Sequence, residues 1–179
     1  MRPTLDDIRT RLWQDTAAET YGDQYARHVL EQYKICLEMA DRISQRRGTA
    51  NTYFLTLNTG IVAALATFYD PTKDIPPVIG IAFFVATSLF CVAWGVMLRS
   101  YRNLNTAKFM VIGLLEERLP ASPFYAAEWT ALAEGKDWRV YIPLGPIEIW
   151  LPVIFFFLNV GLALTLFGGI DCPWLKTPG

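Results

Sequence analysis

The feature that most constrains this chain is the apolar run at residues 78–98, which holds no charged side chain. A helix of that length extends about 30 Å, which matches the hydrocarbon core of a bilayer. Of two further windows, residues 52–69 hold no charged side chain either, and residues 147–170 hold one, Glu148. The 179-residue chain is 53% hydrophobic and 18% charged, against about 25% charged in soluble domains. The sequence therefore predicts an all-α membrane protein with three transmembrane helices per chain.

The charged residues crowd into the segments between these windows, which predicts five regions. Residues 1–51 form a cytoplasmic amphipathic helical region, and 52–98 a transmembrane hairpin with spans at 52–69 and 78–98. Residues 99–146 form a second cytoplasmic helical region, 147–170 the third transmembrane segment, and 171–179 a short tail. Because Glu148, Pro152 and Asn159 interrupt the third window, we expect a kinked span, with a re-entrant or interfacial segment as the alternative.

The orientation follows from arginine and lysine near the ends of the windows. The basic residues before the first window and after the second are Arg42, Arg46, Arg47, Arg99, Arg102 and Lys108. The turn between these windows offers Lys73 alone, balanced by two aspartates. We therefore expect a protein of the bacterial inner membrane with its amino terminus in the cytoplasm and its carboxyl terminus in the periplasm.

Apolar stripes at helical spacing mark both cytoplasmic regions. One stripe consists of Tyr25, Val29, Tyr33, Leu37 and Ala40, and the other of Leu104, Phe109, Ile112 and Leu115 on an extension of the second span to about residue 119. We expect the two stripes to pack together in a helical layer that drives homo-oligomerisation.

Three shorter elements complete the prediction. Thr4 and Asp7 form a possible capping box for a helix over residues 5–17. Ser122 and Pro123 begin a short helix that ends at Gly135. Residues 138–142 are expected to form a short strand or an extended link.

The sequence contains no motif of a known catalytic, cofactor-binding or metal site. His28, the single histidine, lies on an amphipathic helix without a catalytic partner. Glu116 and Glu117 point about 100° apart on a helix, so we interpret them as a solvated helix end. The spacing of Cys36, Cys91 and Cys172 favours neither an internal disulfide nor a zinc site. We expect no enzyme and no cofactor.

Polar residues in or beside the windows are candidates for lining a pore, because burying them in lipid is costly. They are Asn58, Thr59, Asn159 and Glu148. For the two amides the alternative is hydrogen bonding between helices. Glu148 is either an interfacial carboxylate that pairs with Arg139 or an arginine of a neighbouring chain, or one member of an acidic ring in an oligomer.

A cluster beside the membrane is a candidate site for an anion or an oligonucleotide. Its members are Arg46, Arg47, Arg99, Tyr101, Arg102 and Lys108. Symmetry would multiply the positive charge, and the tyrosine ring could stack on a base. The same residues also fit orientation of the chain and contact with anionic lipid.

Residues 100–129 carry a recognisable pattern. Its elements are Tyr101 to Asn105, Ala107 to Phe109, the acidic pair at 116–117, Leu119 with Pro120, and Glu128 with Trp129. The pattern resembles the signature of the RipA-type family of small octameric bacterial inner-membrane proteins. Together with the hairpin and the third window, the resemblance covers about residues 30–170 and implies a homo-octamer.

The arrangement also resembles, more loosely, the HalA-type anti-phage membrane effectors. That resemblance implies a pore held shut by a short DNA oligomer or nucleotide from a partner nucleotidyltransferase. Our leading hypothesis is a gated ion-conducting pore that acts in antiviral defence. The alternative is a non-conducting oligomeric membrane scaffold in envelope or stress physiology, in contact with membrane lipids.

Overall fold

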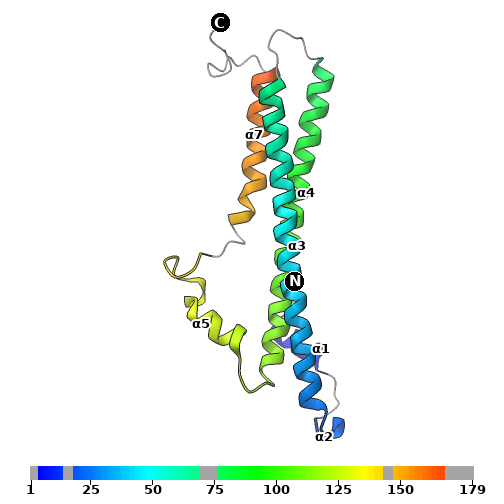
Figure 1. Ribbon diagram of the computed structural model, residues 1–179, viewed down its shortest axis with the longest axis vertical. Helices are drawn as coiled ribbons and strands as arrows, with labels where there is room; N and C mark the ends of the chain where they lie inside the picture. The colour runs from blue at the N-terminus through cyan, green and yellow to red at the C-terminus, as the bar shows by residue number, and fades with distance from the viewer. Residues whose placement is uncertain (1–3, 14–17, 69–75, 143–146, 168–179) are drawn as a thin grey trace. The chain divides into compact units, whose positions relative to one another are not determined.

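The structure is a computed structural model that describes residues 4–13, 18–68, 76–142 and 147–167. These residues form helices and turns, with no strand among them (Figure 1). The chain divides into two compact units. Unit 1 comprises Met1–Arg47 and Ser100–Pro143, and unit 2 comprises Gly48–Arg99 and Leu144–Gly179. Most of the predicted turn between the first two windows, and the whole C-terminal tail, lie outside the described residues.

Two long helices contribute to both units. Helix α3 runs from Tyr25 to Phe68 and helix α4 from Pro77 to Glu116. The cytoplasmic stripe and the first window thus belong to one helix, because residues 25–68 contain no proline and their glycines occur singly. Helix α4 ends about three residues earlier than predicted, where the N–H groups of Arg118 and Leu119 bond to carbonyls three residues back.

Helix α7, Trp150–Phe167, occupies most of the third window. It is continuous because Pro152 lies in its first turn, where the missing N–H removes no intrahelical bond. Of the helices in the described ranges, α4 is the one long and apolar enough to cross a membrane, and α7 provides a shorter apolar helix. Three spans remain a prediction, as does the choice between a spanning and a re-entrant third segment.

Unit 2 is built around the side chain of Trp94, which is fully buried. Phe54 stacks on its ring with a centroid distance of 6.0 Å, and Phe155 contacts it at 5.9 Å. The indole N–H donates to the side-chain oxygen of Asn51 at 3.1 Å. This tryptophan therefore joins α3, α4 and α7.

Unit 1 has a core of its own, formed by Val29, Tyr33, Ala40, Ile112 and Leu115. Residues of the two predicted stripes meet in it, which confirms that the stripes pack together. Leu104 and Phe109 were expected in the second stripe, but they are 46% and 39% exposed. The buried part of the second stripe thus consists of Ile112 and Leu115, near the end of α4, and does not extend back to Leu104.

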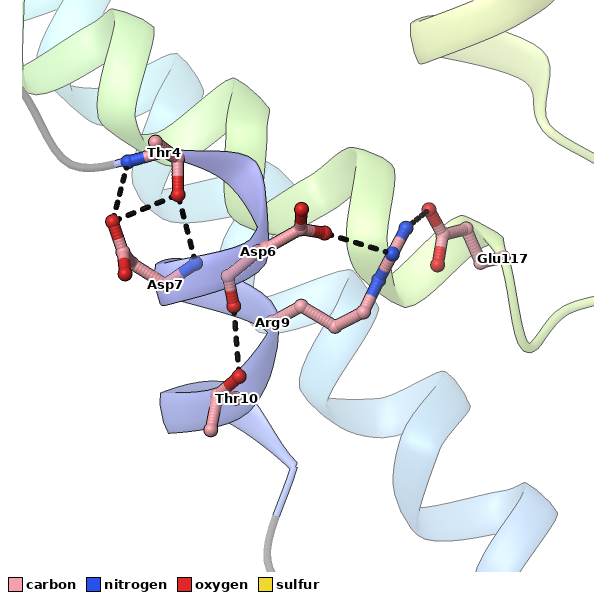
Figure 2. A network of polar contacts seen from close by, with 6 residues as sticks. All are labelled: Thr4, Asp6, Asp7, Arg9, Thr10 and Glu117. Carbon is pink, nitrogen blue, oxygen red and sulfur yellow. Dashed lines mark hydrogen bonds and ion pairs between the residues drawn. The ribbon is translucent and has the colours of Figure 1, made fainter.

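Helix α1, Leu5–Leu12, begins at the predicted capping box. Thr4 accepts from the backbone N–H of Asp7, and the Asp7 carboxylate accepts from the Thr4 backbone and hydroxyl (Figure 2). Arg9 donates to Glu117 at 2.7 Å, which attaches α1 to the end of α4. The short helix α2, Ala18–Tyr21, follows.

The segment after α4 differs from the single short helix that the sequence predicts. It consists of a π-helical turn η1, Pro123–Glu128, then α5, Trp129–Ala131, and a 3-10 turn η2, Ala133–Gly135. Ser122 precedes the helical turns but makes no capping bond. Gly135 ends the segment with a φ of +68°, as a terminal glycine should. Residues 138–140 form a turn, so the predicted strand is absent there.

Candidate functional site

Three polar side chains, one from each helix of unit 2, form a buried hydrogen-bonded chain. Asn58 of α3, Cys91 of α4 and Asn159 of α7 are 2%, 2% and 4% exposed. The Cys91 thiol donates to the side-chain oxygen of Asn58, and the Asn159 amide donates to the Cys91 sulfur, both at 3.6 Å. Asn58 also donates to the backbone carbonyl of Phe54 at 2.8 Å. We call this set the amide chain.

The amide chain satisfies both asparagines within one protomer. Hydrogen bonds of this kind between membrane helices contribute about 0.6 kcal/mol, and at most about 2 kcal/mol. A cavity of about 10 Å³ beside Asn159 and Thr87 has space for roughly one water. The sequence left interhelical bonding open as the alternative for both amides, and their role as pore-lining residues stays a prediction. Sequence reasoning missed Cys91, whose place at the middle of an apolar window gave no polar signal.

The outer faces of the three helices in unit 2 differ in chemistry. Exposed positions of α4 are large and apolar, among them Ile81, Leu89 and Val96. Those of α7 include Ile154, Phe157 and Leu164. Helix α3 instead exposes one row of small and hydroxyl-bearing residues, spaced three or four apart: Thr52, Thr56, Thr59, Ala63 and Thr67. We call this row the threonine stripe.

The threonine stripe contains Thr59, one of the predicted pore-lining residues. Glu148 lies just before α7 and is half-buried. The two asparagines point into the bundle of helices, whereas Thr59 lies on its outside. The structure of one protomer thus separates the predicted pore-lining set into an inner pair of asparagines, an outer threonine and the half-buried Glu148.

Glu116, interpreted from sequence as a solvated residue, is only 2% exposed, so that interpretation is wrong. One carboxylate oxygen accepts from the Tyr33 hydroxyl at 3.0 Å and the Phe124 N–H at 3.2 Å. The other accepts from the Ser122 hydroxyl at 2.5 Å and the Tyr125 N–H at 3.0 Å. Four donors match the acceptor capacity of an ionised carboxylate. We call this arrangement the Glu116 hub.

The Glu116 hub joins α3, the end of α4 and the start of η1 within unit 1. A carboxylate at a helix C-terminus opposes the helix dipole, and the four hydrogen bonds offset that penalty. Burial, together with the hydrogen bond and charge of Glu116, raises the pKa of Tyr33 to about 12. Its neighbour Glu117 is exposed and pairs with Arg9, as a solvated helix end should.

A signal for the hub was present in the sequence. Glu116 lies four residues after Ile112, so it shares the helical face of the apolar stripe. A residue on that face is buried when the stripe packs against α3. Its donors could not be inferred, because Tyr33 is 83 positions away in the chain.

The predicted anion or oligonucleotide residues are distributed over both units. Arg99 belongs to unit 2, and the other members belong to unit 1. Arg46, Arg99 and Arg102 are exposed. Arg47, Tyr101 and Lys108 are half-buried, and the Lys108 ammonium lies 3.8 Å from the sulfur of Met39. Their role in ligand binding stays a prediction.

The described residues hold no group of three or more histidine, cysteine or acidic side chains that could bind a metal ion. Cys36 and Cys91 are free thiols, while Cys172 lies outside the described residues. His28 accepts or donates a hydrogen bond of 2.7 Å with the Tyr21 hydroxyl. In the described part of the chain, Cys36, Cys91 and His28 form no recognisable catalytic arrangement with one another.

Comparison with known proteins identifies the family. No curated protein and no solved structure matches the chain. The family model of the octameric membrane protein family matches residues 30–168, which include α4, α7, the amide chain and the Glu116 hub. Helices α1 and α2 lie before the matched residues. The chain therefore belongs to the octameric membrane protein family and is an oligomeric membrane protein.

Proposed function

We propose that eight copies of this chain form a gated ion-conducting pore in the bacterial inner membrane. The threonine stripe carries this proposal. Apart from Tyr53 and Trp150 near the window ends, its hydroxyl groups are the polar groups that the described outer faces of the unit 2 helices expose within the apolar windows, whereas α4 and α7 present largely apolar faces suited to lipid. In an octamer, a stripe of hydroxyl groups is best placed away from lipid, toward neighbouring copies and the space they enclose.

The conducting path in this proposal runs between copies. Within one protomer, the cavity beside the amide chain has a volume of only about 10 Å³, which is space for about one water. Thr59 then lies at the path, and Asn58 and Asn159 hold the helix that presents it. Rotation of α3 would bring Asn58 itself toward the path, and this is the gating movement that we propose.

The ligand and the biological role rest on separate grounds. The exposed Arg46, Arg99 and Arg102 support control by a nucleotide or short DNA, since symmetry would place eight copies of each around one axis. The resemblance to HalA-type effectors supports a role in anti-phage defence, in which an opened pore dissipates the membrane gradient. A partner nucleotidyltransferase would supply the ligand.

Conductance across a planar bilayer tests the pore, using the full-length octamer with Thr59→Cys. A charged methanethiosulfonate reagent should reduce or block the current of this variant, because the modified side chain would obstruct the path. The matched control is Val92→Cys, on the exposed apolar face of α4, which the reagent should leave unchanged. Wild-type protein controls for the native cysteines. A silent bilayer with an intact octamer would refute conduction.

A non-conducting scaffold is the second candidate, and the amide chain favours it. Because Asn58 and Asn159 satisfy each other through Cys91, their presence in apolar helices needs no water-filled path. Filter binding with short single-stranded DNA separates the two functions. The ligand-gated pore requires saturable binding that weakens as salt rises, whereas the scaffold predicts none.

A further inference from the structure

A groove in unit 1 is not explained by the functions proposed above. It has a volume of about 600 Å³ and lies between α4 and the segment from η1 to Tyr141, which turns back beside the end of α4 (Figure 1). Helix α4 contributes Asn105, Thr106, Phe109 and Met110. The facing segment contributes Phe124, Tyr125, Glu128, Trp129, Leu132 and Tyr141.

The walls of this groove are aromatic and exposed. Phe109, Phe124, Tyr125 and Trp129 have exposed fractions of 39%, 38%, 44% and 49%. Lipid does not account for them. Leu98 is the last residue of the predicted second span, and Phe109 follows it by 11 residues, which is about 16 Å along the helix axis. The headgroup layer on one side of a bilayer is only about 5–8 Å deep. Exposed aromatic rings outside the membrane indicate a protein partner.

The groove also contains an unsatisfied acceptor. The side-chain oxygen of Asn105 is buried and has no hydrogen-bond partner in the described residues. A buried polar atom without a partner destabilises the fold.

A second copy of the chain is the partner available in an octamer. Copies in one membrane share one orientation, so a closed octamer relates them by rotation about the membrane normal. Such a ring joins two different faces of the protomer at every interface. The contact must also join residues at the same height above the membrane, because the rotation involves no translation.

One exposed apolar site on α3 meets both conditions. Ile35 and Met39 are 56% and 44% exposed, one turn apart on the same side of the helix. The sulfur of Met39 lies 3.8 Å from the ammonium of Lys108, which fixes its height as that of Phe109 in the groove. We call this pair the α3 ridge.

The chemistry of the α3 ridge complements that of the groove. A methionine thioether packs favourably against aromatic rings. Arg42 follows on the same side of α3, at helical spacing from Ile35 and Met39, and Glu128 lines the groove. We propose that the α3 ridge of one copy inserts into the aromatic groove of the next copy, and that eight such contacts close the octamer.

Photocrosslinking of the full chain tests the contact directly. A benzophenone amino acid replaces Ile35, and octamers are assembled from two isotopically distinct populations. Mass spectrometry should find mixed-isotope adducts between position 35 and residues 105–110 or 124–132. Adducts between copies that map elsewhere would overturn the proposal.

Charge substitution provides the second measurement. Met39→Glu places a carboxylate against the aromatic walls and Glu128, so most of the protein should shift from octamer to smaller species in native mass spectrometry. The matched control is Leu30→Glu, because Leu30 is 40% exposed and lies about 140° around α3 from Ile35. This control should remain octameric. An octamer that survives Met39→Glu, or dissociates equally with Leu30→Glu, would contradict the proposal.

Discussion

Glu116 is the residue whose surroundings depart most from expectation. It accepts four hydrogen bonds in a buried position, two of them from the backbone at Phe124 and Tyr125. A carboxylate in this position sets the chain direction after α4. Glu116 is the last residue of α4, and its carboxylate binds Phe124 and Tyr125 at the start of η1. The hub therefore determines where η1 begins.

Glu116→Gln should destabilise unit 1 by at least about 2 kcal/mol, because the amide replaces an acceptor oxygen with a donor that faces other donors. Proteolysis of the 117–128 segment should accelerate, and its rate measures the effect. Glu117→Gln is the control, since an exposed ion pair contributes only about 0–1 kcal/mol. Equal cleavage rates in the two variants would contradict the role of the hub.

Tyr33 should titrate late. Its pKa is raised from 10.0 to about 12, so the neutral hydroxyl stabilises the folded state. That contribution is complete below pH 10 and is lost as the pH rises through about 12. Ultraviolet titration of the folded octamer should show a late tyrosine step that Tyr33→Phe removes. If the titrations of the two proteins coincide, Tyr33 does not carry the raised pKa.

At the scale of elements, the close approach of η1 to α4 depends on Gly113. A Cβ at this position would lie 2.5 Å from Cδ2 and 2.6 Å from Cγ of the Tyr125 ring. Since Cγ lies near the backbone, the ring cannot move aside without displacing η1. The glycine thus permits the contact that the Glu116 hub holds in place.

Gly113→Ala should displace η1 from α4 and accelerate amide hydrogen exchange over residues 122–131. Gly48→Ala is the matched control in α3, because no atom lies within 4 Å of its added Cβ. That substitution should stabilise the helix by about 0.5–1 kcal/mol. Unchanged exchange in Gly113→Ala would show that Tyr125 does not pack on α4 as described.

For the whole molecule, the open question of topology has a direct test. With the predicted cytoplasmic amino terminus, three spans place the C-terminus in the periplasm, whereas a re-entrant third segment returns it to the cytoplasm. A C-terminal alkaline phosphatase fusion should be active and a C-terminal green fluorescent protein fusion dark, because the first folds only in an oxidising compartment. The reverse pattern would contradict the combination of three spans and a cytoplasmic amino terminus.

The sequence by itself determined which segments are apolar, which face of α3 is buried against α4 and where α1 begins. These properties depend on residue type at a local spacing, such as the stripe from Val29 to Ala40 or the capping box at Thr4. Their physical basis is local, so they could be predicted. The same reasoning failed for residues 122–142, where short turns depend on contacts with α4.

Only the tertiary structure decided which polar groups meet. Asn58, Cys91 and Asn159 come from three helices, and Tyr33 reaches Glu116 across 83 positions. Hydrogen-bond partners are set by distance in space. These side chains meet only when the helices that carry them are packed at one particular offset along their axes, which the sequence does not specify. The aromatic groove arises in the same way, because its walls come from α4 and from a segment that turns back beside it.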